Sequence, residues 1–498
     1  MILAVVIAYL LVVTLVGVLG HRLFRGTGED YFLASRSIGP FVLLMTLVGT
    51  NMTAFTMLGA SGEAHRQGIR VFALMGSSSA LIIPFLFYFI GTRCWWLGKR
   101  QGYLTQVQFI RGRYDSGALG TLLFVVLILL MLPYMLIGVK GGGDALTAIT
   151  GGAASGVPSW VGSLLVCTVI FGYVTYGGMR STAWVNTFQT AVFMVVGAVA
   201  FFVIAGRYGG IGGAMETLRE THRDLIVFGT SRFQTLQMLS YLLLPLSIGA
   251  FPHLFSHWLS AKSAAAFRSA IVLYPLCFAV VWFPSVALGA IGRIDFPPPL
   301  DGPILVKLIL SNAGGLLAGC LGAGVFAAIM SSLDSQSLAL GTMFTQDIVR
   351  HYGFDNKLPE QRQVLFGRAF VAVFLLLAFL CSLVTTQSIF ALGVWSLTGF
   401  AGLLPIFVGA LYWKRSTKQG AAAAILTVVA LWAYFFSQSL RVEGAYTVAG
   451  TGLIPAGVIV PASVLALIIV SLATAPPKEI SKFFPSPGEP EPREADVA

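Results

Sequence analysis

The stretch Gly49-Thr50-Asn51-Met52-Thr53 interrupts an apolar run that extends from about residue 38 to residue 60. An apolar run of about 20 residues is long enough to cross a bilayer as one helix. Glycine and polar residues near its middle predict a break at membrane depth, where free backbone carbonyls are tolerated only beside a cavity or a bound group. A second interruption, Pro245 followed by Gly249-Ala250-Phe251-Pro252-His253, lies in the apolar run 234–260.

The composition around these two runs is that of a polytopic membrane protein. Of 498 residues, 56% are hydrophobic and 10% are charged, whereas a soluble domain has about 25% charged residues. The sequence therefore predicts an all-α integral membrane protein with 13 transmembrane helices. The predicted spans lie near residues 1–20, 38–60, 71–92, 118–138, 157–178, 184–206, 234–260, 268–291, 315–340, 365–385, 388–412, 420–437 and 453–474.

The order of the spans predicts an internal repeat. Leaving the first span aside, the next ten divide into two sets of five with opposite topology, which is the inverted-repeat plan of secondary transporters. Both interruptions lie in the first helix of a set, as that plan requires, although glycine and proline also occur in membrane helices as kinks or packing sites. The predicted segments are an extra N-terminal helix at 1–20, five-helix repeats at 38–206 and 234–412, two C-terminal helices at 413–474 and a short disordered cytoplasmic tail at 475–498.

The net charge of +11 is explained by basic loops on one side of the membrane, so no nucleic-acid partner is expected. The positive-inside rule assigns those loops to the cytoplasm. No basic residue precedes the first span and several follow it, which predicts an N-terminus outside and a retained first helix, not a cleaved signal peptide. Because the number of predicted spans is odd, the C-terminus is then expected in the cytoplasm. We therefore expect a multi-pass protein of the plasma membrane, embedded in the lipid bilayer, with no obligate protein partner evident.

A bound cation is expected in the span 315–340, which contains the sequence AAIMSSLDS at residues 327–335. At 100° per residue its three serines and Ala328 fall on one helical stripe, with Asp334 at the edge. Oxygen atoms are the ligands that hard cations prefer. No Lys or Arg lies in the middle of a predicted span, so the partner of Asp334 is predicted to be mobile, either Na+ or a proton. A mid-membrane charge costs about 2.5–3.5 kcal/mol, which makes this acid a functional candidate.

Five segments together resemble the sodium:solute symporter family, whose members include pantothenate, proline, monocarboxylate and sugar carriers. They are EDYFLASRSIG at 29–39, YGGMRS at 176–181 running on to Gln189, Pro252-His253, AAIMSSLDSQS at 327–337, and LYWKR at 411–415 with Gly420-Ala421. The resemblance covers nearly the whole chain. It implies a leucine-transporter-like (LeuT-like) 5+5 inverted-repeat core with one extra N-terminal and two extra C-terminal helices, and co-transport of Na+ with a small solute.

The resemblance also implies where Na+ binds, which is between the broken first core helix and the eighth core helix. Gly49, Met52 and Ala328 would offer backbone carbonyls, and Ser331 and Ser332 would offer hydroxyls. The competing role for each serine is a hydrogen bond to the carbonyl four residues earlier or to a neighbouring helix. Na+ is expected as the coupling ion, with no organic cofactor.

Two positions depart from the family pattern. Many members carry an acid in the stretch after the Gly-Gly-x-Arg turn, suggested to help the ion leave inwards, and this chain has Asn186 there. Conversely, Asp334 is an acid where several members have a small or polar residue. Both are candidates for the ion path, and Asp334 is also a candidate proton carrier. Coupling to H+ therefore stays open as an alternative.

The solute is expected beside the two breaks. Half-helix N-termini that point into the cavity favour a carboxylate. Sugar carriers of the family typically present a Gln where this chain has Thr56, and a Lys in the seventh core helix, whereas the span 268–291 has none. An organic acid or amino acid is thus favoured over sugar. The candidate residues are Asn51, Thr53, Thr56, Tyr134, His253, Trp258 and Trp395. His253 is equally consistent with a structural hydrogen bond, and the tryptophans with packing or the membrane interface.

Other classes of function find less support in the sequence. A membrane sensor module would need a long cytoplasmic extension, and the tail after residue 475 is short. An enzyme is not expected, because the sequence has no P-loop, no metal-ligand cluster and no catalytic triad whose members can be argued to meet. A channel or uniporter on the same fold stays open, since only flux measured against a gradient separates it from a symporter.

Overall fold

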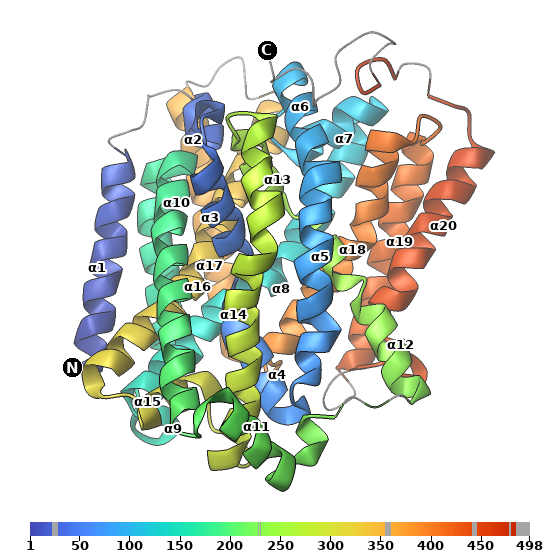
Figure 1. Cartoon of the computed structure of the whole chain (residues 1–498). Helices are drawn as coiled ribbons and strands as arrows, with labels where there is room; N and C mark the ends of the chain where they lie inside the picture. Colours follow the sequence, from blue (N-terminus) through green and yellow to red (C-terminus); the bar gives the residue numbers. More distant parts are fainter. Residues whose placement is uncertain are drawn as a thin grey trace.

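The computed structural model describes residues 1–21, 28–227, 229, 231–353, 360–440, 446–477 and 480–484, which form an all-α bundle (Figure 1). The first half contains α1 (Ile2–His21), α2 (Gly28–Leu33), α3 (Pro40–Asn51), α4 (Ala60–Gln67), α5 (Ser77–Leu86), α6 (Thr92–Gln101), α7 (Gln106–Tyr114), α8 (Gly117–Thr150), α9 (Gly152–Ser155) and α10 (Ser159–Gly206). The second half contains α11 (Gly210–Thr221), α12 (Arg232–Tyr241), α13 (Pro252–Ser260), α14 (Phe267–Asp295), α15 (Ile304–Asn312), α16 (Gly315–Met343), α17 (Glu360–Val384), α18 (Ile389–Tyr412), α19 (Lys418–Ser439) and α20 (Ala456–Ala473).

Shorter helical turns join several of these helices. Turns of 3-10 helix lie at Ala34–Arg36, Arg223–Leu225, Leu244–Ala250, Ala264–Ala266 and Val448–Gly450. Turns of π-helix lie at Phe55–Gly59, Phe72–Gly76, Phe87–Gly91 and Phe344–Arg350. We call the end of the bundle that carries α2, α6 and α7 the upper end, and the end that carries α9, α11 and α15 the lower end, as they appear in Figure 1.

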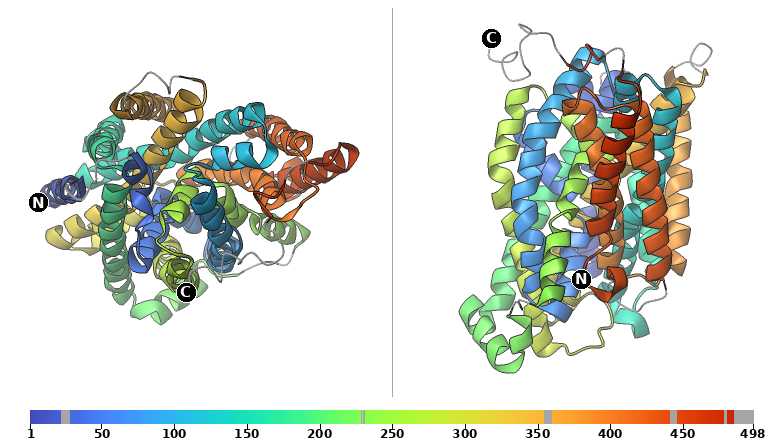
Figure 2. Two further views of the ribbon diagram at one scale, coloured as in Figure 1. Left: turned by 90° about the horizontal axis from the view of Figure 1, so that it is seen from above. Right: turned by 90° about the vertical axis from the view of Figure 1, so that its right-hand side faces the viewer.

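Helix α16 forms the centre of the bundle. Every residue from Leu321 to Met343 is buried, and the helix contacts α1, α3, α8, α10, α13 and α17. In contrast, α1 exposes one stripe of large apolar side chains, namely Leu3, Ile7, Leu11 and Leu15. Their spacing of four residues places them on one helical face. Figure 2 shows α1 at one edge of the bundle and α19 with α20 at the opposite edge. The polar stripe of α16 is therefore surrounded by protein, and the apolar stripe of α1 faces outward.

Both predicted interruptions are breaks between bent helices. The segments Pro40–Asn51 and Phe55–Gln67 meet at 50°, and Arg232–Ala250 and Pro252–Ser260 meet at 51°. At the first break the Thr53 hydroxyl accepts a hydrogen bond from the Phe55 backbone N–H at 2.9 Å. At the second, Pro252 is the first residue of α13, where its missing N–H and fixed φ are tolerated. These local features explain why each helix stops and restarts at its break.

Helix α10 covers two predicted spans, 157–178 and 184–206. Its backbone leaves the helical region at Gly178, with φ 59° and ψ −164°, and a Cβ there would lie 2.7 Å from the carbonyl oxygen of Tyr31 in α2. Only glycine fits this conformation and this close approach. Figure 1 places α9 and α11, which flank α10 in sequence, at the lower end, whereas α2 is at the upper end. The chain therefore ascends one leg of α10 and descends the other.

The all-α prediction is confirmed, while the exact number of spans stays a prediction. Among the described residues, ten helices are long and apolar enough to cross a membrane, and up to twelve if each bent pair forms one span. The predicted count of thirteen, the two five-helix repeats and the segment boundaries are not tested by this arrangement.

Two sequence segments from the family resemblance meet at the upper end. An Arg180 guanidinium N–H donates to the Asp30 carboxylate at 2.6 Å, and the Ser35 hydroxyl donates to the same oxygen at 2.8 Å. The Tyr31 hydroxyl donates to the Thr175 carbonyl at 3.3 Å. The entry segment at 29–39 is thereby fixed to the turn of α10.

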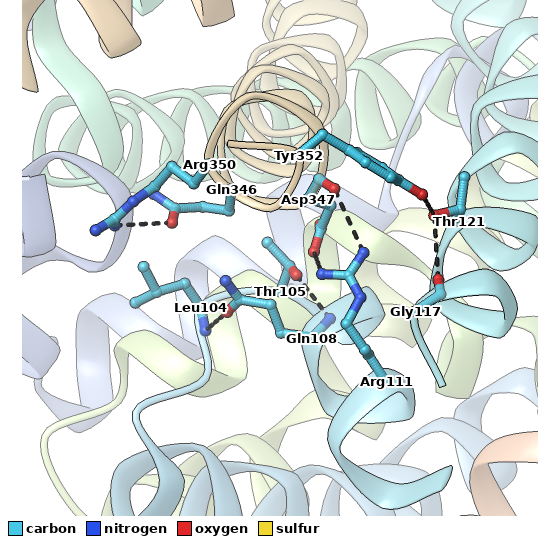
Figure 3. Close-up of polar contacts among 10 residues, drawn as sticks. All are labelled: Leu104, Thr105, Gln108, Arg111, Gly117, Thr121, Gln346, Asp347, Arg350 and Tyr352. Atoms are coloured by element: carbon cyan, nitrogen blue, oxygen red, sulfur yellow. Dashed lines mark hydrogen bonds and ion pairs between the residues drawn. The ribbon is translucent and has the colours of Figure 1, made fainter. Parts of the chain in front are cut away.

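The same end is closed by contacts between α7 and the π-helical turn that extends α16 (Figure 3). Nη1 of Arg111 lies 3.6 Å from Oδ1 of Asp347, and Nη2 of Arg111 donates to the Asp347 carbonyl at 3.3 Å. The Tyr352 and Thr121 hydroxyls lie 2.5 Å apart beside this pair. These contacts join α7 and α8 to the end of α16.

The described part of the C-terminal tail also packs on α7. Of the predicted disordered tail at 475–498, residues 475–477 and 480–484 are described. Phe483 is buried, with its ring 5.0 Å from Phe109 and 6.1 Å from Tyr103, measured between centroids. The ring of Phe484 lies near the cationic groups of Arg93, Arg113 and Lys414, at 5.4–5.8 Å. This short turn therefore adds aromatic and cation–π contacts to the upper end.

Candidate functional site

The break after α3 brings backbone oxygens to the serine stripe of α16. The Ser331 hydroxyl lies 2.8 Å from the Gly49 carbonyl and 3.1 Å from the Ala328 carbonyl, within donating distance of both. Gly49 is in the last turn of α3, where carbonyls lack partners within the helix. Three of the five predicted ligands thus converge. Met52 is buried at the break, and the Ser332 hydroxyl donates to the Ile329 carbonyl of its own helix at 3.3 Å.

The close approach of α10 explains why glycine is needed at position 49. A Cβ on Gly49 would lie 2.1 Å from the Thr190 hydroxyl oxygen of α10, and that hydroxyl donates to the Met45 carbonyl at 2.9 Å. A larger residue would push α10 and α3 apart and move the Gly49 carbonyl. The donors gathered here are neutral carbonyl and hydroxyl oxygens, which fit a hard monovalent cation better than a soft metal.

A second polar cluster lies beside this site. The Ser335 hydroxyl is 2.8 Å from the Thr50 hydroxyl, 3.0 Å from Nε2 of His257 and 2.7 Å from Nδ2 of Asn186, which donates to it. Asn186 also donates to Thr50 at 3.1 Å. All four side chains are buried. The cluster therefore links α3, α10, α13 and α16 at the depth of the first break.

Asp334 is fully buried at the edge of this cluster. Its carboxylate accepts from the Tyr173 hydroxyl at 3.2 Å, from the Ser335 backbone N–H at 2.5 Å and from the Ser335 hydroxyl at 3.3 Å. In the described part of the chain it forms no ion pair with Lys or Arg. Asn186 Oδ1 is a further buried polar atom without a partner among the described residues. Unpartnered buried polar atoms are rare, and this one marks the region as a candidate binding or transfer site.

A central cavity of about 40 Å³ lies beside the first break. Four of the predicted solute residues line it, namely Asn51, Thr53, Thr56 and Tyr134. The Asn51 amide donates to the Tyr274 hydroxyl. At about 15 Å³ per water, the cavity has room for only two or three waters. The central cavity is therefore small in this structure.

The other three predicted solute residues lie elsewhere. The His253 ring stacks on Tyr134 at 5.4 Å, outside the cavity lining. Trp258 packs against Phe87 with centroids 6.2 Å apart. Trp395 lines a different, larger cavity at the lower end.

Comparisons with known proteins identify the family of the chain. The model of the sodium:solute symporter family matches residues 31–428. The chain belongs to the sodium:solute symporter family. Curated relatives include the sodium/pantothenate symporter of Escherichia coli, 26% identical over 89% of this chain and 92% of that protein. The osmoregulated proline transporter OpuE of Bacillus subtilis is 25% identical over 93% of each chain.

Solved structures share the fold of this symporter. A substrate-bound, outward-open Na+-coupled sialic acid symporter has a TM-score of 0.77 at 18% identity and covers 96% of this chain and 98% of its own. MhsT in complex with L-phenylalanine has a TM-score of 0.58 at 13% identity, over 88% and 99%. Family membership supports Na+-coupled symport and a multi-pass membrane location.

Several residues of this symporter's central cavity were missed from sequence. Ser79, Ser247, Phe278 and Trp282 also line it. The run Ser77-Ser78-Ser79 inside an apolar span was a usable signal for the first. No signal in the sequence marks Phe278 and Trp282, because an aromatic side chain in a membrane helix is most often a packing residue.

Proposed function

We propose that this chain is a Na+-coupled secondary active symporter that imports a small organic acid or amino acid by alternating access. The observation that carries the proposal is the 2.8 Å contact between the Ser331 hydroxyl and the Gly49 carbonyl at a helix break. Gly49, Met52 and Ala328 would hold Na+ through carbonyls, and Ser331 and Ser332 through hydroxyls. Na+ supplies the charge and gradient that drive the cycle. The N-terminus is placed outside the cell and the C-terminus in the cytoplasm, following the basic loops.

Coupling between ion and solute follows from one shared backbone segment. Gly49 contacts the ion-site serine, and Asn51, two residues later, lines the central cavity. An ion that fixes the end of α3 therefore also fixes the solute residues, and each ligand favours the conformation that binds the other. One Na+ moving through 100 mV gains about 2.3 kcal/mol, enough for a solute gradient of about fifty-fold.

The solute class rests on the polarity of the cavity. Asn51, Thr53 and Thr56 offer amide and hydroxyl groups, and a helix that restarts after a break directs the positive end of its dipole towards that break. Of the two restarting helices, the one that begins at Phe55 lines the cavity. Its dipole and these polar groups favour a carboxylate, held at the first break by hydrogen bonds.

The experiment is the thermal stability of the detergent-purified protein in NaCl and in choline chloride at equal ionic strength. A specific ligand at 100 times its dissociation constant stabilises the protein by about 2.7 kcal/mol. We expect a Na+-specific increase in wild type that is lost in the Ser331→Ala/Ser332→Ala variant. Ser337→Ala is the matched control, because this buried serine of α16 only donates to the Leu333 carbonyl at 2.7 Å. A shift that survives in the double variant would reject the site.

Proton coupling is a second candidate, favoured by the burial of Asp334 without an ion pair in the described chain. In that case Asp334 would bind and release H+, with Tyr173 donating to its charged form. We expect stability that does not respond to Na+ but changes with pH in wild type and not in Asp334→Asn. If Asp334→Asn has the same cation dependence as wild type at every pH, Asp334 has no part in coupling.

A further inference from the structure

A second cavity, of about 560 Å³, lies at the lower end of the bundle. Its walls come from α4, α12, α18, α19 and the segment before α20, and it shares no lining residue with the central cavity. Its volume is in the range of small-molecule sites, about 300–1,000 Å³. We call it the lower cavity.

Among the described residues that line the lower cavity, one acid and one base are present, and both lie on the same helix. Nη2 of Arg66 lies 2.9 Å from Oε2 of Glu63, and the Gln67 amide donates to the other carboxylate oxygen. Glu63 is 4% exposed and Arg66 is 55% exposed. The carboxylate is therefore held in place by its neighbours, while the guanidinium keeps N–H groups free to reach a ligand.

Four aromatic side chains, Tyr241, Phe390, Trp395 and Tyr446, line the lower cavity together with polar and aliphatic residues. Trp395 is held edge-on by Trp432 and Phe436, at 5.9 and 5.4 Å between centroids, and Tyr446 lies beside it at 6.3 Å. The Thr398 hydroxyl, one turn further along α18, is fully buried and lacks a partner among the described residues. A buried polar atom without a partner is rare, and this residue lies in the wall of the lower cavity.

The lower cavity is separated from the central one by stacked rings. Phe55 of the central lining stacks on Phe390 of the lower cavity, with centroids 5.1 Å apart and an interplanar angle of 19°. Glu63 lies seven residues beyond Thr56, about 10 Å along the helix. A solute that enters from the lower end therefore meets the lower cavity first.

We propose that the lower cavity is a second binding site, for a zwitterionic amino acid. Its carboxylate pairs with Arg66, its ammonium group with Glu63, and its side chain packs against Trp395 and Phe390. In the described part of the wall, the pair of Arg66 and Glu63 matches a ligand that also carries both charges, whereas a simple anion would meet the Glu63 carboxylate. This inference rests on the proposed transport of small solutes and narrows their class to amino acids.

The test is a thermal-stability screen of the purified full chain with each of the twenty standard amino acids, in NaCl and in choline chloride. We expect at least one to stabilise the protein in both salts, because the lower cavity does not include the ion-site residues. The dissociation constant of that amino acid should rise about tenfold or more in Arg66→Gln and in Glu63→Gln, because each variant loses one charge-assisted hydrogen bond to the ligand. A tenfold rise equals about 1.4 kcal/mol. Arg66 is exposed, so its variant is expected to fold.

The matched control is Glu216→Gln/Arg219→Gln, which removes an exposed pair of the same i,i+3 spacing on α11, 3.6 Å apart. This control variant should bind the amino acid with the same dissociation constant as wild type. The proposal is overturned if no amino acid stabilises the protein, or if the stabilisation is unchanged in both lower-cavity variants. Either result leaves the Na+-specific shift that depends on Ser331 and Ser332 intact, so failure here is distinguishable from failure of the symporter proposal.

Discussion

The two ends of the bundle use a carboxylate and a guanidinium in different ways. At the upper end, Asp347 is fully buried, Arg111 is 15% exposed, and the pair joins segments 236 residues apart. At the lower end, Glu63 and Arg66 are three residues apart on one helix and line a cavity of about 560 Å³. The upper pair therefore holds tertiary structure together, whereas the lower pair presents its charges to a space that admits a ligand.

The two ends also differ in how open they are. The upper end is closed by the contacts of α7 with the turn Phe344–Arg350 and by the Phe483 turn, whereas the lower end contains the lower cavity. In the proposed orientation the lower end faces the outside and the upper end faces the cytoplasm. The proposed alternating-access cycle needs such a state for uptake from outside, and we expect its opposite state to open the contacts between α7 and the turn Phe344–Arg350.

The largest expected effect is loss of the upper pair. Arg111→Met keeps an apolar stem but leaves the Asp347 carboxylate buried without its partner. Breaking a buried pair by removing one member costs about 3 kcal/mol or more. We expect a decrease of that size in the free energy of unfolding, measured by titration with SDS.

The control for this prediction is the double variant Arg111→Met/Asp347→Asn, which removes both charges. It should recover most of the lost stability, because no unpaired charge remains. A single variant as stable as wild type would mean that the pair does not hold the upper end.

A smaller effect is expected at the Phe483 turn. Burying a phenylalanine side chain contributes about 2 kcal/mol, so Phe483→Ala should raise the detached fraction of the turn about thirty-fold. Limited proteolysis of the tail measures this opening, because cleavage follows the population of the open form. Lys482→Ala is the control, since Lys482 is exposed in the same turn. Equal cleavage of Phe483→Ala and wild type would contradict a closing role for this ring.

The sequence predicted what depends on local pattern. Apolar windows located the helices. Gly49 and Pro252 marked the breaks, because glycine and proline alter the backbone conformation at their own positions. The stripe of Ser331 and Ala328 followed from helical periodicity. The contact between Arg111 and Asp347 could not be predicted, because it depends on how helices far apart in sequence pack. Trp258 and Trp395 show the same limit, since an aromatic residue looks alike from sequence whether it packs in a core or lines a cavity.

The smallest effect is expected for the lower pair, which makes the comparison between the ends quantitative. Arg66→Met leaves Glu63 beside the lower cavity, where water replaces the guanidinium, and the Gln67 amide still donates to the carboxylate. Arg66 is 55% exposed, so solvent screens its attraction to Glu63 more than it screens the upper pair, and the SDS titration should show a smaller loss than for Arg111→Met. A loss as large as at the upper end would mean that the lower cavity does not hydrate Glu63. The charges there would then be structural, and they would not be available to bind an amino acid.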